Sequence, residues 1–367
     1  DVAGPTLVAI HQVIQQLGLY NESWCNEPSS PHQINTSEQL FNSEFCFYQR
    51  DKILPHEKAN VGIISQFIRV NKKPVFTSAN AKNHLVTFAE VMAMYLLVWS
   101  PELWELVDLS IENQTAIPQS CQARYQQELA IITQFSSGLV AVRRAMAHLP
   151  VYMIFDDHDV TDDWNLTRDW EEKAYNNAFS KQIIGNALIG YWLCQGWGNA
   201  PEKFTTLMSA APKYFSQNGI QEHNELIDTL LSWEDWHYCL ETSPKTVVLD
   251  TRTRRWRSES NGGKPSGLMD WESLSELQQE LINQPDIILV SPAPIYGVKL
   301  IETIQRIFTF IGKPLLVDAE NWMAHSGTAN VMLNIFRHHK TPPNFIILSG
   351  DVHYSFVYEV THRFRRS

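Results

Sequence analysis

Cysteine is scarce and scattered in this chain, and its spacing excludes two kinds of small stabilised domain. The five cysteines are Cys25, Cys46, Cys121, Cys194 and Cys239. No two of them have the close spacing of zinc-ribbon ligand pairs, and they are too few in 367 residues for a dense disulfide framework. Because their number is odd, at least one thiol is unpaired within the chain.

Long apolar runs and excess positive charge are missing as well. The longest apolar run, residues 91–99, is much shorter than the roughly 20 residues that a membrane-spanning helix needs. Lys and Arg number 29 against 40 Asp and Glu, which gives a net charge of −11. Such a chain does not bind nucleic acid or an anionic membrane through bulk charge. A phosphate substrate would therefore need local positive charge, from metal ions or a few arginines.

The composition is that of a compact globular protein. Hydrophobic residues make up 44% of the chain and charged residues 19%, and the length suffices for one large domain or two ordinary ones. The chain starts at Asp1 without a signal-like segment and ends in the strand-like stretch 357–366. We expect a fragment cut at both ends, so both a cytoplasmic and an exported parent protein remain open.

The pattern of apolar residues changes near residue 145. Helical spacing covers residues 1–20, 85–99 and 122–148. The last of these helices carries along one face Leu129, Ile132, Phe135, Leu139, Val142 and Met146. Beyond residue 150, short aliphatic runs alternate with helical segments, which predicts a layered α/β domain.

The expected strands of this domain end in acidic or turn residues. They are 151–155, 246–250, 286–292, 315–318 and 345–351, with expected helices at 175–193, 274–281 and 301–311. Because the runs are apolar throughout, we expect strands that are buried on both faces under helices. In such sheets a ligand binds at the carboxyl ends of the strands, where these acids fall.

Acidic residues gather directly after the run 151–155. Positions 156–163 hold five aspartates and one histidine, with no Lys or Arg before Arg168. Such acids repel one another at neutral pH unless a cation neutralises them, and carboxylate with imidazole suits a divalent or trivalent metal. The alternative is a solvated acidic turn with a capping Asp. The position at a strand end, and a second cluster, favour the metal.

The second cluster is Ser349-Gly350-Asp351-Val352-His353, again after an aliphatic run. Asp and His two positions apart in a turn can present an oxygen and a nitrogen toward one point. Alone, a turn-forming Asp and a core histidine explain these residues equally well. Together with the first cluster they predict a metal site of several ligands, and donors without thiolate favour Mn, Fe, Zn, Mg or Ca.

Three stretches together resemble the PhoD-like alkaline phosphatases. They are Asp156-Asp157-His158-Asp159 followed by Asp163-Trp164, then Leu249-Asp250-Thr251-Arg252, then Ser349-Gly350-Asp351-Val352-His353. That family belongs to the calcineurin-like metallophosphoesterases, which build a two-metal site on an αββα sandwich. The resemblance covers roughly residue 152 to the end. It implies a phosphoesterase core over 146–367, truncated at its C-terminal end, with 1–145 as a largely helical insertion or cap of the same domain.

The resemblance also assigns roles to residues. Asp157 takes the position of the metal-binding Asn in the family's Gly-Asn-His-Asp/Glu motif, and His158 that of the histidine that steadies the phosphate or protonates the leaving oxygen. Asp351 and His353 take the positions of the late metal ligands, with Asp in place of the first histidine, as in PhoD-like members. Two divalent or trivalent metal ions are implied.

Three further residues each have two possible roles. Arg252 either neutralises a phosphate oxygen bidentately or forms an internal pair with Asp250. Asp163 is either a further metal ligand or a helix N-cap. His237, in a tryptophan-rich turn, is either the family's isolated metal-binding histidine or a packed turn residue.

The expected function is metal-assisted hydrolysis of a small-molecule or polymeric phosphate ester, monoester or diester, with His158 as general acid. Two motifs of the superfamily have no counterpart in this sequence, an early Asp-x-His-type motif and the Gly-Asp motif that supplies the bridging carboxylate. The alternatives are a metal-stabilised binding module without turnover, an inactive fragment of the enzyme, and a carboxylate-pair glycosidase that needs no metal.

Overall fold

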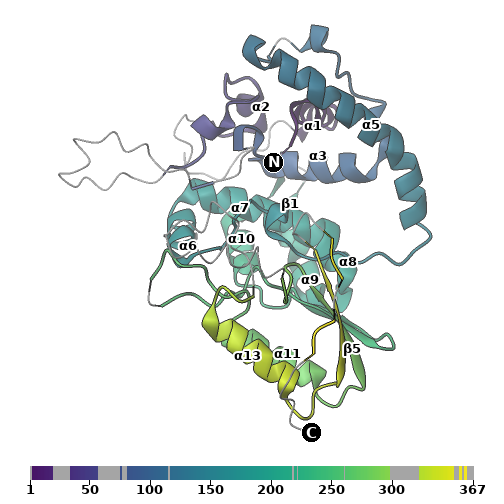
Figure 1. Ribbon diagram of the computed structural model, residues 1–367. Coiled ribbons are helices and arrows are strands. Elements are labelled where there is room, and N and C mark those ends of the chain that lie inside the picture. Colours follow the sequence, from purple (N-terminus) through teal and green to yellow (C-terminus); the bar gives the residue numbers. More distant parts are fainter. Residues whose placement is uncertain are drawn as a thin grey trace, which may run out of the picture. The chain divides into compact units, whose positions relative to one another are not determined.

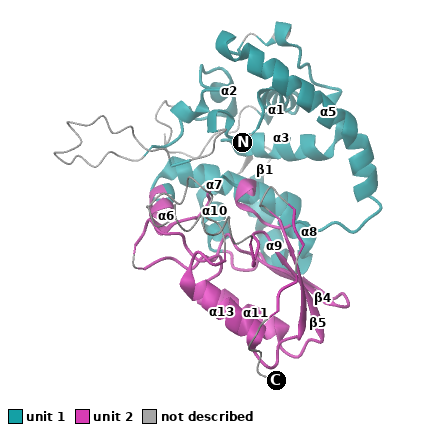
Figure 2. Cartoon of the chain, viewed as in Figure 1, with its two compact units in different colours: residues 1–153, 160–162, 174–232 teal, residues 154–159, 163–173, 233–367 magenta. Residues whose placement is uncertain are grey.

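The protein is a mixed α/β chain with many helices and a four-stranded sheet (Figure 1). The computed structural model describes residues 2–19, 34–56, 75–76, 81–114, 116–216, 219–220, 222–259, 261–297, 322–350, 355–357 and 359–361. It separates into two compact units (Figure 2). Unit 1 comprises residues 1–153, 160–162 and 174–232, and unit 2 comprises 154–159, 163–173 and 233–367. The assignment of 1–145 as a cap stays a prediction, and the helical unit continues beyond that boundary.

Unit 1 is built almost entirely from helices. They are α1 (Gly4–Gln16), α2 (Ser37–Phe41), α3 (Phe88–Trp99), α4 (Pro101–Trp104), α5 (Gln122–Met146), α7 (Ala178–Tyr191), α8 (Trp197–Asn199), α9 (Thr205–Tyr214) and α10 (His223–Leu231), with a ribbon of β1 (Phe215–Ser216) and β2 (Gly219–Ile220). The helices expected over 1–20, 85–99, 122–148 and 175–193 are thereby confirmed as α1, α3, α5 and α7.

The central helices of unit 1 begin and pack for local reasons. Thr87 and Glu90 form a reciprocal capping box that starts α3. Asn177 caps α7 by accepting the Ser180 N–H, and α7 is buried on nearly all sides. Gly185 of α7 allows the close approach of α10, because a Cβ at this position would lie 2.3 Å from Ile227 Cγ1.

A fully buried ionic cluster links α1, α3 and the segment before α3. The Arg50 guanidinium donates to both carboxylate oxygens of Glu90, at 2.6 and 3.0 Å, and His11 Nε2 lies 2.9 Å from Glu90 Oε1. Glu90 Oε2 also accepts the N–H groups of Val86 and Thr87. All three charged side chains are 0% exposed. Since a buried charge is tolerated only when it is paired, these residues depend on one another.

Unit 2 carries the four-stranded mixed sheet. Its strands are β3 (Tyr238–Leu240), β4 (Lys245–Val248), β5 (Asp286–Ser291) and β6 (Asn344–Ser349), in the order β3-β4-β5-β6. β4, β5 and β6 are parallel, and β3, which the sequence pattern did not indicate, is antiparallel to β4. The expected strands at 246–250, 286–292 and 345–351 are thus confirmed, with slightly different bounds.

Helices α11 (Trp271–Leu281) and α13 (Ser326–Arg337) pack on one face of this sheet (Figure 1). The core between them contains the side chains of Val247, Leu274, Leu277, Leu281, Ile287, Leu289, Met332, Ile335 and Phe336. Asp270 caps α11 by accepting the Ser273 N–H, and the His325 ring accepts the Thr328 N–H at the start of α13. The helix expected over 274–281 is confirmed as the greater part of α11.

The expectation that the strands are buried on both faces is wrong for β6. Phe345 and Ile347 pack against the core, whereas Ile346 and Leu348 are 55% and 52% exposed. In β5, residues alternate between buried and half-buried, as they do in a sheet with one covered face. Continuous hydrophobicity alone therefore overestimated how much of this sheet is covered among the described residues.

The strand expected over 151–155 is also wrong, because in the part of the chain that the structure describes these residues have no strand conformation and pair with no strand. Their backbone is instead satisfied by a side chain. Met153 donates its N–H to Asn199 Oδ1 at 2.8 Å, and its carbonyl accepts from Asn199 Nδ2 at 2.9 Å. An amide side chain offers both an acceptor oxygen and a donor NH₂ group, so Asn199 takes the place of a neighbouring strand.

Other expectations fall outside the described residues, namely the helix over 301–311 and the strand over 315–318. Among the helices that the structure describes, none has both the length and the apolar character needed to cross a bilayer. Among the described residues, Cys46, Cys121 and Cys194 are free thiols, of which Cys46 is buried.

Replacing the central carboxylate of the ionic cluster should destabilise unit 1. Glu90→Gln leaves Arg50 buried without its counter-charge. A loss of about 3 kcal/mol or more in the free energy of unfolding is expected, because removing one partner of a buried ion pair costs about 3–5 kcal/mol. Urea denaturation measures this loss. Glu105→Gln, at an exposed position of the same unit, is the matched control, and equal midpoints for both variants would contradict the account.

The same cluster predicts a pH dependence of stability. Burial acts to lower the pKa of His11, but the facing Cys46 and Glu90 outweigh burial and raise it to about 9. Because the folded pKa lies above the ordinary 6.5, the stabilisation is complete below pH 6.5 and is lost as the pH rises through about 9. Urea midpoints of wild type and His11→Gln should therefore converge between these pH values. A constant difference over this range would show that His11 is neutral in the folded protein.

Candidate metal centre

The loop after residue 155 is a compact turn built on its own carboxylates. It starts with one turn of 3-10 helix, Asp157–Asp159, and contains two residues in the left-handed region, Asp163 (φ 62°) and Asn165 (φ 60°). Asp and Asn enter this region more readily than most residues. The Asp156 N–H donates to Asp159 Oδ2 at 3.0 Å, which closes the turn. Residues 156–163 are called the acidic loop below.

Asp157 holds the two ends of the acidic loop together. Its Oδ1 accepts the His158 N–H and its Oδ2 accepts the Asp163 N–H, both at 3.0 Å. The Asp157 side chain is buried, with 4% exposed. A carboxylate has about four acceptor positions, so these two bonds leave room for a further ligand.

Thr161, within the same loop, is held by a histidine from a distant part of the chain. His84 Nδ1 lies 2.6 Å from the Leu85 carbonyl and therefore carries the proton, which leaves Nε2 to accept from the Thr161 hydroxyl at 3.0 Å. Burial lowers the pKa of His84 to about 3, so the ring is neutral. This bond fixes the residue that precedes Asp162.

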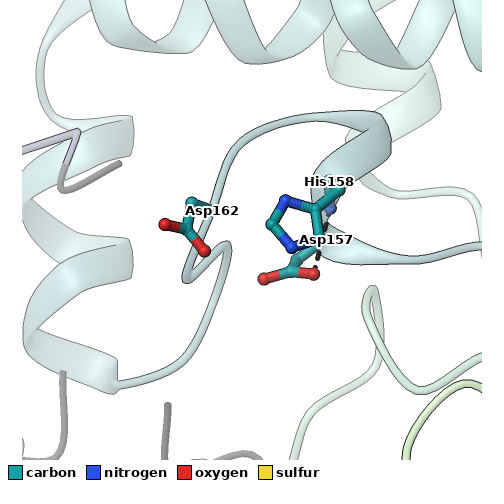
Figure 3. A group of neighbouring side chains, drawn as sticks. All are labelled: Asp157, His158 and Asp162. Carbon is teal, nitrogen blue, oxygen red and sulfur yellow. Dashed lines mark hydrogen bonds between the residues drawn. The ribbon is translucent and has the colours of Figure 1, made fainter. Parts of the chain in front are cut away.

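Asp157, His158 and Asp162 form a group that could hold a metal ion. One potential ligand atom from each lies within 4.8 Å of the others. Figure 3 shows the two carboxylates and the imidazole facing a common space. Asp157 is buried, Asp162 is half-buried and His158 is exposed, so the group is open on the side of His158.

The donor set fits a divalent cation. Two ligand atoms on one ion, each at roughly 2.0–2.4 Å, lie at most about 4–5 Å apart, which is the spacing found here. Two oxygens and a nitrogen without thiolate suit Mn, Fe, Zn or Mg. These three residues supply part of a coordination sphere, and further donors have to come from elsewhere in the protein, from water or from substrate.

Arg252 provides positive charge that the local sequence lacks. Its side chain is 0% exposed, donates to Asp156 Oδ1 and lies 3.3 Å from Asp157 Oδ1. Its backbone N–H donates to Asp250 Oδ1 at 2.8 Å. In the sequence, these acids have no Lys or Arg beside them before Arg168. In the structure, they face the guanidinium of Arg252, 96 positions after Asp156. The ion pair that the structure describes for Arg252 is with Asp156, whereas the expected partner Asp250 accepts its backbone N–H.

A second arginine lies behind the loop. Burial and the charge of Arg252 lower the pKa of Arg255 to about 9, against the opposing fields of Glu171, Asp157 and Asp163. The Arg255 guanidinium lies 3.4 Å from the carbonyls of Trp164 and Ser266. The acidic loop is therefore backed by two buried cations, which reduce its charge without entering the group of ligands.

The structure places the expected site residues unevenly. It brings Asp157 and His158 together and puts Arg252 against the same loop. The third member of the group is Asp162, while the backbone of Asp163 contacts Asp157. His237 is half-buried and lines a cavity of about 350 Å³ under β4, at which Asp250 and Arg254 also lie. The metal roles of Asp163 and His237 stay predictions.

Asp351 and His353, the expected late ligands, lie outside the described residues. β6 ends at Ser349, directly before them, as the sequence pattern indicated. Their metal roles stay predictions too.

Sequence reasoning missed Asp162, His84 and Arg255. Asp162 belonged to the same acidic run, but alternation along a loop does not tell which of two adjacent aspartates faces inward. His84 and Arg255 show no local pattern, because their roles depend on tertiary contacts.

Comparison with protein-family models, with curated proteins and with solved structures finds no match to this chain. The resemblance to the PhoD-like phosphatases thus rests on the three sequence motifs alone.

The geometry predicts which aspartate binds metal. Asp162→Asn should weaken Mn²⁺ binding about tenfold or more, since even substitutions that only orient a ligand cost 10–100-fold. Asp163→Asn should change the affinity much less, because its backbone N–H is the group that contacts Asp157 and Asn tolerates its positive φ. Isothermal titration calorimetry measures both affinities. The reverse order would make Asp163 the ligand.

Proposed function

We propose that this protein is a metal-dependent phosphoesterase of the PhoD-like kind, which hydrolyses phosphate monoesters or diesters. The observation that carries the proposal is the group of Asp157, His158 and Asp162, which lies in the loop that holds the Asp-Asp-His-Asp motif. The chain contains two Asp/His motifs, Asp157-His158 and Asp351-His353, in the same order as the PhoD-like family. In a protein that binds no metal, this agreement would be a coincidence.

The sheet of unit 2 supports the finer fold in this proposal, an αββα sandwich. Its face opposite α11 and α13 carries Ile288 and Val290 of β5, half-buried, paired with Ile346 and Leu348 of β6, more than half exposed. An apolar sheet face next to solvent is unfavourable, and a second sheet is a common cover for it. In the proposed fold that second sheet packs here.

The reaction needs positive charge where the phosphoryl group sits. Bound divalent ions would polarise the phosphoryl oxygens and lower the pKa of a water molecule for in-line attack. Asp157, His158 and Asp162 would hold one such ion, and Asp351 and His353 complete the proposed ligand set. We propose two such ions, which can be Ca, Fe, Mn, Zn or Mg.

The chain's own residues act by position and proton transfer. His158 is the exposed member of the metal group, so one of its ring nitrogens can face the ion while the other donates a proton to the departing alkoxide as general acid. Arg252 holds Asp156 and Asp157 in place, and its complete burial favours this positioning role over direct contact with a phosphate oxygen. Asp157 fixes the shape of the loop through the His158 and Asp163 N–H groups.

A binding module without turnover remains the second candidate. The pairing of Asp156 and Asp157 with Arg252 favours it, because a loop neutralised in this way is stable without catalysis. A metal-independent glycosidase finds no such support, since its two carboxylates would need separate, unpaired positions about 5–10 Å apart across a sugar site.

Hydrolysis of bis(p-nitrophenyl) phosphate and p-nitrophenyl phosphate by the whole chain, with Mn²⁺ or Ca²⁺ added, tests the proposal. Activity should disappear with EDTA and return with excess metal. Metal binding without hydrolysis of either ester would support the binding module or an inactive fragment of the enzyme, and hydrolysis that survives EDTA would exclude the metal mechanism.

His158→Ala should distinguish esters by their leaving group. A general acid typically contributes about 10²–10⁴-fold, and it matters most when the leaving oxygen is strongly basic. Turnover of an alkyl phosphate ester should therefore fall about a hundredfold, while that of a p-nitrophenyl ester changes little. His339→Ala, at an exposed position of the same unit, is the control. An equal loss for both esters would show that His158 acts as a ligand or through structure only.

A further inference from the structure

Helix α5 carries an exposed apolar stripe along its outer side. Its members are Ile131, Phe135, Gly138, Val142, Ala145 and Leu149, separated alternately by four and three positions. Ile131, Val142 and Leu149 are 66%, 50% and 65% exposed. The five members from Ile131 to Ala145 lie within α5, and their alternating spacing is that of the seam of a coiled coil. Leu149 lies in the turn that follows the helix, which ends at Met146. This set of six residues is called the outer stripe below.

The outer stripe is not the surface that holds α5 in unit 1. The helix is anchored by Tyr125 and Leu139, its two buried residues, and by packing against α1, α3 and α4. Phe135 borders the two surfaces, with its ring 6.1 Å from that of Trp104 and 42% of the residue exposed. The remaining members point away from the core of the unit, in the part of the chain that the structure describes.

The order of large and small residues in the outer stripe is self-complementary. The outer stripe contains two kinds of seam position, namely 131, 138 and 145 on the one hand and 135, 142 and 149 on the other. In an antiparallel pair of identical helices, each position of the first kind faces a position of the second kind on the partner. Centred on residue 140, this pairing sets Phe135 opposite Ala145 of the second copy and Val142 opposite Gly138 of the second copy. The third layer sets Leu149 opposite Ile131 of the second copy. Two of the three layers thus match a bulky side chain with a small one.

We propose that the outer stripe binds the outer stripe of a second copy of this chain, as an antiparallel helix pair. Each layer then occurs twice by two-fold symmetry, as in other isologous interfaces. A parallel pair would set Gly138 against Gly138 and Ala145 against Ala145, which leaves voids in two layers, and voids remove packing energy. Space around Gly138 is open, since a Cβ there would meet no atom within 4 Å.

The distribution of charged residues on α5 is compatible with the antiparallel helix pair. The outer stripe contains no charged residue between positions 131 and 149. Arg143 and Arg144 lie on other sides of α5, and Arg143 pairs with Glu102 of α4 at 2.5 Å. Two copies with net charge −11 each repel at long range, so association should strengthen as salt is added.

The extent of the outer stripe predicts a weak dimer. The helical part of the outer stripe, residues 131–146, rises about 24 Å, and a seam of that length with Leu149 beyond it covers about 300 Å² on each copy. A stable dimer commonly buries about 800 Å² per partner. The proposed pair is therefore reversible, with a dissociation constant of about micromolar or above.

Sedimentation velocity of the whole chain from 1 to several hundred micromolar, about the range that such an interface requires, tests the proposal. Wild type should shift toward the dimer with concentration. Val142→Asp places a charge in the central layer and should raise the dissociation constant about tenfold or more. Val140→Asp is the matched control, because Val140 is also exposed, at 60%, and lies about 200° around the helix from Val142. Wild type that stays monomeric, or two variants that weaken association equally, would overturn the proposal.

Cross-linking tests the register independently of affinity. Gly138→Cys and Val142→Cys should form a disulfide-linked dimer when the two variants are mixed under oxidation, and much less when either is oxidised alone. The unsubstituted chain gives the background from the native thiols. A stronger Val142→Cys homodimer would mean a parallel pair and would refute the proposed register. A monomer that binds anionic vesicles through Val142 would show that the outer stripe serves a membrane surface instead.

Discussion

Crowded negative charge is the constraint around which the acidic loop is organised. Five aspartates in eight positions repel one another unless positive charge lies close by. Arg252 supplies part of it from the segment after β4, by donating to Asp156 and lying beside Asp157. That pairing leaves Asp162 and the open side of Asp157 facing His158. An ion at this point would neutralise what the arginine does not.

The same carboxylate has both a structural and a chemical role. Asp157 closes the acidic loop through two backbone N–H groups and still presents an oxygen to the metal group. Its replacement would therefore alter loop shape and metal affinity together. Asp162 and Asp163 separate these roles, because one contributes a side chain to the group and the other a backbone N–H to Asp157. This distinction makes the two adjacent aspartates the informative positions.

Local pattern predicted the parts of the fold that local physics determines. The helices α1, α3, α5 and α7 and the strands β4, β5 and β6 follow from spacing and apolar runs. The strand expected over 151–155 failed because Asn199, 46 positions away from Met153, satisfies its backbone. The burial of β6 failed because an aliphatic run does not state how many layers cover it.

In the candidate site as well, local sequence predicted some residues, whereas others depend on contacts between distant parts of the chain. Asp157 and His158 were predictable, since motif and chemistry coincide in one loop. The partner of Arg252 was not, because 96 positions separate it from Asp156. Similarly, the helical period of α5 was evident in the sequence, but which side faces solvent depends on how Tyr125 and Leu139 pack against its neighbours.

Anomalous X-ray diffraction from crystals of the whole chain grown with Mn²⁺ locates the bound metal. A manganese peak is expected within coordination distance of Asp157, His158 and Asp162, with Arg252 still paired to Asp156. A peak elsewhere on the acidic loop, or none at saturating metal with the loop well ordered, would contradict it. In that case the two arginines alone would neutralise the loop.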